Sequence, residues 1–264
     1  MPEGLTIGGR QFRSRLMLGT GRYRTMEEQN AAIEASGCEI ITVAIRRLNL
    51  DDPNEKTLLD YIDWSRYQIL PNTAGARTAD EALYIARLAR RLVEGMNGPD
   101  PNWIKVEVQP DPQSLLPDPI GTFEACQVLV SESFVVLPYI GADPILAKRL
   151  EEIGCATVMP LGSPIGSGQG ILTLEEIRLI VANAHVPVVV DAGLGVPSDC
   201  ALAMEAGADA CLVNTAVAQA KDPERMAEAM RMGVEAGRTA YEAGRIPRRE
   251  LAAASSPVAG MVTL

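Results

Sequence analysis

The feature of this sequence that most constrains its fold is a repeated alternation of two patterns. Eight short runs are rich in β-branched and apolar residues, and each is followed by a segment with apolar residues at helical spacing. The runs occupy residues 15–21, 39–45, 67–74, 103–108, 134–140, 156–161, 186–193 and 210–217. Strands that alternate with helices predict a parallel α/β sheet covered on both faces, which agrees with the nearly continuous apolar character of the runs.

A closed (β/α)8 barrel, the TIM barrel, is the simplest arrangement of these elements, and we expect residues 1–264 to form it as a single domain. An open doubly wound sheet is the alternative, although no run is followed by a G-x-G-x-x-G turn. Residues 1–13 predict a small N-terminal hairpin around Gly8–Gly9, which could cover the bottom of the barrel. Residues 251–264 form a low-complexity tail that is either flexible or folded over a site.

Several helix boundaries are signalled by capping residues. Thr78 with Glu81, and Thr173 with Glu176, fit the capping box, in which a hydroxyl and a carboxylate satisfy free backbone N–H groups. Aspartate precedes proline at two further helix starts, Asp143–Pro144 and Asp222–Pro223. Glycine is expected to end helices at Gly37, Gly154 and Gly207.

Composition excludes several classes of function. The net charge of -10 argues against nucleic acid and against an anionic membrane surface as partners. A single histidine, His185, precedes an apolar run and is predicted to lie in a loop, so histidine triads and multi-histidine metal sites are excluded. The five cysteines form no CxxC pair and are predicted to be buried free thiols. Together with the absence of a signal pattern or a long apolar run, they predict a cytoplasmic protein.

Polar side chains at the C-terminal ends of barrel strands are the functional candidates. Lys105 and Glu107 interrupt the run 103–108, and they share one face of the strand because side chains alternate. We expect both to point into the barrel. A desolvated lysine has a lowered pKa and can attack a carbonyl carbon, and a carboxylate beside it can move the protons of imine formation. A structural ion pair and anion binding by the lysine stay open as alternatives.

Further candidates follow the last three runs. Asp191 ends the seventh run, where it could act as acid or base or could cap the following turn. Glycine-rich segments follow at 162–170 and 193–195, and Asn214 and Thr215 follow the eighth run. Loops after the seventh and eighth strands are the usual phosphate site of this barrel. The residues themselves therefore predict a barrel enzyme that forms a lysine imine with a phosphorylated ketone or aldehyde.

Five stretches also carry a family resemblance. They are "ILPNTAGARTADEA", "NWIKVEV", "VMPLGSPIGSGQGI", "VVVDAGLGVPSDCALAMEAGADACLVNTAVAQAKDP" and "ASSPVAG". Together they resemble bacterial thiazole synthase, an enzyme of the thiamine pathway, from about Leu18 to the C-terminal tail. "PLGSPIGSGQG" is the most specific of these motifs. One departure is Ala76, where many members have cysteine, and it puts no catalytic role in doubt because imine chemistry needs no thiol there.

The resemblance implies a reaction and a site. The substrates would be 1-deoxy-D-xylulose 5-phosphate, dehydroglycine and sulfur from the thiocarboxylate of a small carrier protein, and the product a thiazole phosphate carboxylate. Lys105 matches the imine-forming lysine, and Glu107 and Asp191 match the acid/base carboxylates. Substrate-binding positions match Gly166, Ala192, Gly193, Asn214 and Thr215. Family members form homotetramers and use no metal or other cofactor.

Other interpretations predict different behaviour. A lysine aldolase would act on a phosphosugar without a sulfur donor, a phosphosugar-binding barrel would have no turnover, and a flavin-binding barrel would be coloured. None of them explains the lysine, the carboxylates and the glycine-rich loops together. The pair Arg46–Arg47 after the second run is predicted to form surface salt bridges, with the steering of an anion as the alternative.

Overall fold

The structure is a computed structural model, and it describes residues 4–47, 58–96, 99–253 and 255. The eight predicted runs form one parallel sheet, so the location of every predicted strand is confirmed. The strands are β3 (Leu16–Gly19), β4 (Ile40–Ala44), β5 (Gln68–Asn72), β6 (Trp103–Val106), β7 (Val135–Ile140), β8 (Met159–Pro160), β9 (Val189–Asp191) and β10 (Ala210–Val213).

The sheet closes into a barrel. Its strand order is β8-β7-β6-β5-β4-β3-β10-β9, so the two end strands are β8 and β9. These two are joined by isolated parallel bridges, Val158 to Val188 and Leu161 to Asp191. The (β/α)8 TIM barrel is therefore confirmed, and the open sheet is excluded.

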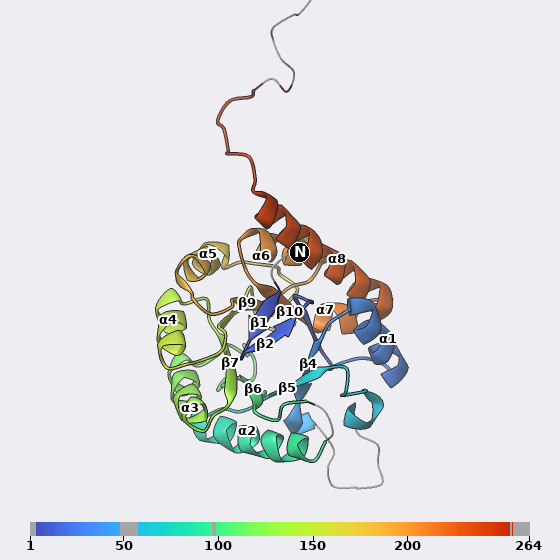
Figure 1. Cartoon of the computed structure of the whole chain (residues 1–264), viewed down its shortest axis with the longest axis vertical. Helices are drawn as coiled ribbons and strands as arrows, with labels where there is room; N and C mark the ends of the chain where they lie inside the picture. Colours follow the sequence, from blue (N-terminus) through green and yellow to red (C-terminus); the bar gives the residue numbers. More distant parts are fainter. Residues whose placement is uncertain (1–3, 48–57, 97–98, 254, 256–264) are drawn as a thin grey trace, which may run out of the picture.

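Helices surround the barrel on its outer side (Figure 1). They are α1 (Met26–Ser36), α2 (Ala79–Glu94), α3 (Pro119–Ser131), α4 (Pro144–Glu152), α5 (Leu174–Asn183), α6 (Pro197–Glu205), α7 (Thr215–Ala218) and α8 (Pro223–Ala243), with short 3₁₀ turns at Ile45–Arg47 and Leu58–Tyr61. The last of them, α8, packs against both α1 and α6. In the described part of the chain, no helix is both long and apolar enough to cross a membrane.

Two apolar clusters follow from the alternation of side chains along the strands. Ile104, Val106 and Val108 lie in the larger cluster, between sheet and helices. Trp103, one residue earlier, lies in a second cluster inside the barrel. Because Lys105 and Glu107 alternate with the outward-facing residues, the predicted orientation of the "WIKVEV" run is confirmed.

The N-terminal hairpin closes the bottom of the barrel. It consists of β1 (Leu5–Ile7) and β2 (Arg10–Phe12), which pair antiparallel, and Figure 1 shows it over the barrel centre. Its apolar side chains belong to the inner cluster, and the Phe12 ring meets the Trp103 ring edge to face at 5.7 Å between centroids. Of the predicted hairpin segment, residues 1–3 lie outside the described residues.

Most predicted helix ends are confirmed. The side chains of Thr78, Asp143 and Asp222 cap α2, α4 and α8. Gly37 has the left-handed φ of 59° at the end of α1. The five cysteines are buried and free, as expected: Cys38, Cys126, Cys155, Cys200 and Cys211.

Three local predictions are wrong. The strand predicted over 210–217 ends at Val213, because α7 begins at Thr215. The Thr173 hydroxyl does not cap α5, because it donates to the Leu161 carbonyl at 2.7 Å. At α2, the Glu81 carboxylate accepts from the backbone N–H of Arg77 (3.1 Å) and so leaves the predicted box half formed.

The C-terminal tail leaves α8 away from the barrel (Figure 1). Residues 251–253 and 255 are exposed, so these residues do not cover a site. The other tail positions named in the prediction, 254 and 256–264, lie outside the described residues.

Candidate active site

A cavity of about 1130 Å³ opens at the C-terminal ends of the barrel strands. The loops after β3, β4, β5, β6, β8, β9 and β10 contribute to its walls. All the site residues predicted from the sequence line this one cavity: Lys105, Glu107, Gly166, Asp191, Ala192, Gly193, Asn214 and Thr215. The barrel thus brings together residues that are far apart in the chain.

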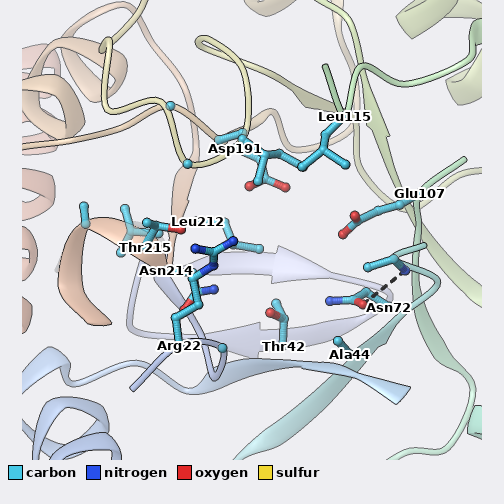
Figure 2. Close-up of a pocket in the computed structure, with 18 of the residues that line it drawn as sticks. Arg22, Thr42, Ala44, Asn72, Glu107, Leu115, Asp191, Leu212, Asn214 and Thr215 are labelled. Carbon is cyan, nitrogen blue, oxygen red and sulfur yellow. Dashed lines mark hydrogen bonds between the residues drawn. The ribbon is translucent and has the colours of Figure 1, made fainter. Parts of the chain in front are cut away.

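The cavity floor holds a buried ion triad. Lys105 Nζ lies 3.0 Å from Glu107 Oε1 and 2.5 Å from Asp191 Oδ2, and none of the three side chains is more than 6% exposed. Figure 2 shows the Glu107 and Asp191 carboxylates pointing into the cavity from different walls. Sequence spacing indicated the contact between Lys105 and Glu107. The contact with Asp191 joins β6 to β9 across the barrel interior and depends on closure of the sheet.

The position of Glu107 is fixed by neighbours that the sequence analysis did not single out as partners. Glu107 lies just beyond the end of β6, and the buried Thr73 hydroxyl holds it there by accepting from its N–H and donating to its carbonyl, both at 2.8 Å. Gln109 Nε2 donates to Glu107 Oε2 at 3.0 Å. One carboxylate oxygen therefore faces Lys105, and the other is held by Gln109.

The triad raises the pKa of two of its members. Burial opposes the charge of Lys105, but the Asp191 and Glu107 carboxylates outweigh burial and raise the pKa of Lys105 above its ordinary value. Burial raises the pKa of Asp191, and the Lys105 ammonium offsets this effect only in part. The expectation of a lowered lysine pKa is therefore wrong for the resting site, because two buried carboxylates lie beside this lysine.

Tyr139 lies against the triad from β7. Its ring centroid is 5.3 Å from Lys105 Nζ, close enough for a cation–π contact. Among the described residues its buried hydroxyl has no hydrogen-bond partner. Burial, followed by the charges of Asp191 and Glu107, raises the pKa of Tyr139, so the phenol stays protonated.

The loops after β8 and β9 interlock above the triad. Ala192 and Gly193 both have left-handed backbones, with φ of 68° and 78°. The Gly193 carbonyl accepts from the N–H of Gly170 at 2.9 Å. A Cβ at Gly193 would overlap the Ser163 hydroxyl and lie 2.7 Å from the Ser163 backbone nitrogen. Only glycine fits this crossing, because it combines the left-handed backbone with the absence of a side chain.

The loop after β10 joins the same region. A Cβ at Gly166 would lie 3.8 Å from the Thr215 hydroxyl, so the β8 loop reaches the start of α7. In the amide orientation that satisfies both of its polar atoms, Asn214 donates to the carbonyls of Gly21 (2.9 Å) and Gly19 (3.2 Å). Backbone, amide and hydroxyl groups from three loops thus meet at one side of the cavity.

Some cavity residues were missed or placed differently by the sequence. Arg22 and Gln109 line the cavity and were not predicted. Arg22 gave no pattern signal, whereas Gln109 continues the face of Lys105 and Glu107 and could have been found by extending the alternation. Arg46 forms the predicted salt bridge, 3.5 Å from Glu81, yet it also lines the cavity. Within the described residues no group of His, Cys, Asp and Glu side chains is arranged to hold a metal ion.

Comparison with known proteins assigns the chain to a family. The family model described as thiazole biosynthesis protein ThiG matches residues 6–257. The chain belongs to the ThiG family. It is 61% identical over 258 residues to the thiazole synthase of Synechococcus sp. (strain ATCC 27144 / PCC 6301 / SAUG 1402/1), covering 98% of this chain and 94% of that protein. It is 59% identical over 261 residues to that of Acaryochloris marina (strain MBIC 11017), covering 99% and 95%.

Among solved structures, the fold is similar to a chain in the crystal structure of the Amycolatopsis orientalis BexX/CysO complex. The TM-score is 0.80 at 34% identity, covering 94% of this chain and 98% of that chain. The resemblance to thiazole synthase is thus confirmed. As a ThiG family member, the chain is an enzyme of thiazole synthesis in thiamine biosynthesis.

Proposed function

We propose that this enzyme builds a thiazole phosphate carboxylate from 1-deoxy-D-xylulose 5-phosphate, dehydroglycine and the sulfur of a carrier-protein thiocarboxylate. The reaction begins with an imine between Lys105 and the ketone carbon of the sugar. The observation that carries this proposal is the buried Lys105 between Glu107 and Asp191 at the open end of the barrel. Such a triad is poorly explained by stability alone, because buried ion pairs are often no better than apolar packing.

The first step requires loss of a proton from the Lys105 ammonium. Asp191 is its closest acceptor, at 2.5 Å, and burial makes this carboxylate more basic than usual. The neutral amine then adds to the ketone carbon to give a carbinolamine. That intermediate loses its hydroxyl as water, with a proton supplied by Asp191 or Glu107, and leaves the protonated imine. The same two carboxylates serve the later proton transfers and water losses.

We propose that the phosphate end of the sugar lies at the converging loops. Gly166, Ala192, Gly193, Asn214 and Thr215 offer donors on the β8 to β10 side of the cavity. Lys105 stands on β6, so a ligand bound at both places would extend across the cavity. The loops after the last two strands are the common phosphate site of this fold, which supports the orientation.

The partner and the assembly are also proposals. A sulfur-carrier protein is supported by the similar chain that was solved within the BexX/CysO complex. By family resemblance, we propose that the protein works in the cytoplasm as a homotetramer in which residues 1–264 form one domain. No metal or other cofactor is assigned a step.

Borohydride reduction tests the imine. The protein is incubated with 1-deoxy-D-xylulose 5-phosphate, reduced, digested and analysed by peptide mass mapping. We expect a sugar-phosphate adduct on the peptide that contains Lys105 and none in Lys105→Arg, which keeps the charge but forms no stable imine. An adduct confined to exposed lysines such as Lys148, or no adduct on folded protein that binds the sugar, would overturn the assignment. Thiazole formation that requires carrier thiocarboxylate separates this reaction from an aldolase.

A further inference from the structure

The cavity contains an arginine without a partner. Four cationic side chains line it in the described part of the chain: Arg22, Arg46, Arg77 and Lys105. Lys105 is paired with two carboxylates, and Arg46 with Glu81 and the Gly75 carbonyl. The guanidinium groups of Arg22 and Arg77 have no ion pair or hydrogen bond to any described residue.

Arg22 is distinguished from Arg77 by its backbone. Its φ is 72°, in the left-handed region that a residue with a Cβ seldom adopts. The conformation is fixed on both sides. The carbonyl of Gly21 accepts the Asn214 amide at 2.9 Å, and the ring of Tyr23 packs against the apolar core. Such strain persists where the surrounding structure enforces it, and it concentrates at ligand-binding sites.

The enforced backbone directs the Arg22 side chain into the cavity. Figure 2 shows it extending from the end of β3 on the side where Asn214 and Thr215 lie. The strand neighbour of β3 is β10, which these two residues follow, so topology also places them together. Arg22 therefore contributes a cation to a region whose other donors are uncharged.

That charge matters for a phosphorylated ligand. Gly166, Ala192, Gly193, Asn214 and Thr215 are all neutral, and the chain has a net charge of -10. A phosphate dianion held by neutral donors alone would meet an unfavourable overall field. A guanidinium fork matches phosphate oxygens in geometry and charge, and hydrogen bonds between ions are the stronger kind.

We propose that Arg22 binds the phosphate group of the substrate, closing the phosphate site formed by the β8, β9 and β10 loops. This inference rests on the proposed function for the identity of the sugar, but it does not rest on it for the phosphate chemistry. Arg22 is a binding residue that sets the preference for phosphorylated over unphosphorylated ligands. It takes no part in bond making at Lys105.

Calorimetric titration tests the proposal with three probes: inorganic phosphate, 1-deoxy-D-xylulose 5-phosphate and unphosphorylated 1-deoxy-D-xylulose. In Arg22→Gln the Kd for both phosphate probes is expected to rise about 10- to 100-fold, the range for hydrogen bonds to charged groups. The Kd for the unphosphorylated sugar should stay within about twofold of wild type.

Arg77→Gln is the matched control, because it removes the same charge from the same cavity and the proposal gives it no role. It should leave phosphate binding within about twofold of wild type. Equal effects of the two substitutions, or an Arg22→Gln effect restricted to the KM for dehydroglycine, would overturn the proposal. Wild-type protein that binds inorganic phosphate through Arg22 but does not bind the ketose phosphate would contradict only the proposed substrate.

Arg22→Gly separates binding from folding. Glycine accepts the left-handed backbone without strain, so this variant should unfold at the same or a higher temperature than wild type. It should nevertheless lose phosphate affinity to the same extent as Arg22→Gln. A glycine variant that keeps wild-type affinity would show that the side chain is not the ligand.

Discussion

Lys105 illustrates how a single residue depends on its neighbours for its charge state. A buried lysine alone would tend to lose its proton, whereas here two carboxylates keep it as an ammonium. The converse also holds, because Lys105 is the cation that makes the burial of Glu107 and Asp191 tolerable. Removal of the lysine therefore leaves two buried, uncompensated carboxylates.

Lys105→Met tests this dependence at two pH values. At pH 8 we expect the free energy of unfolding to fall by about 3–5 kcal/mol, because breaking a buried pair leaves charge without a partner. Without Lys105 the pKa of Asp191, already raised by burial, rises further in the folded state. The folded variant then binds protons more readily than the unfolded chain, so the deficit should shrink as pH falls toward 5.

Urea denaturation at pH 8 and pH 5 provides the measurement. Lys148→Met is the control, since Lys148 is exposed and lies 4.0 Å from Glu152, and it should change stability by less than about 0.5 kcal/mol. A deficit that is the same at both pH values would argue against the carboxylates as its cause.

The sequence could predict part of this site. Lys105 and Glu107 share a face because of strand alternation, which is local and can be read from spacing. The contact between Lys105 and Asp191 could not be predicted from spacing, because it depends on the geometry of a closed barrel. Nor could the net direction of the lysine pKa, since burial and charge oppose each other and only distances decide between them. The role of Arg22 depends on a φ value that no pattern around it indicated.

Secondary-structure elements, in contrast, were largely predictable. Strand positions followed from apolar runs and most helix starts from caps, because both signals are local. The errors at Thr173 and at the end of β10 have a common cause. In both places the chain belongs to a loop at the mouth of the barrel, where contacts with neighbouring loops outweigh local preference. The Thr173 hydroxyl, for example, bonds to Leu161 rather than to its own helix.

Gly193→Ala tests the crossing of the β8 and β9 loops. Its φ is 78°, and an added Cβ would overlap the Ser163 hydroxyl. Gly9→Ala is a close control, because Gly9 has φ of 79° with no atom within 4 Å of an added Cβ. Both variants should lose about 1 kcal/mol from the left-handed backbone. Only Gly193→Ala should also lose ligand affinity, by at least about tenfold, because the loops must separate.

Calorimetric titration with 1-deoxy-D-xylulose 5-phosphate, together with thermal unfolding, measures both effects. If Gly9→Ala weakened ligand binding as much as Gly193→Ala, the backbone rather than the loop contact would be responsible. If neither did, the loop crossing would have no part in the ligand site.

At the scale of the whole molecule, stability and binding lie at opposite ends of the barrel. The N-terminal hairpin closes the bottom with apolar side chains, whereas the cavity lies at the C-terminal ends of the strands. Opposite ends of a TIM barrel commonly divide these two tasks. The hairpin should therefore be open to substitution without direct damage to the site.

Phe12→Ala tests this separation. Phe12 is 3% exposed and its ring contacts Trp103, so its truncation should lower the free energy of unfolding by about 3–5 kcal/mol. The KM for the sugar phosphate should stay within about twofold of wild type at temperatures where the variant is folded. Tyr84→Ala, at a side chain that is 70% exposed on α2, should affect neither quantity. A large change in KM for Phe12→Ala would show that the two ends are coupled.

The ammonium form of Lys105 also bears on which molecules the enzyme ignores. Cells contain many reactive aldehydes and ketones, and a free amine in an open cavity would condense with those that diffuse in. As an ammonium, Lys105 has no lone pair with which to attack them. A carbonyl compound must stay bound while a proton moves to a carboxylate, and a passing metabolite leaves sooner. The ion pairs that slow the nucleophile therefore also protect the enzyme from chemical inactivation by unrelated carbonyls.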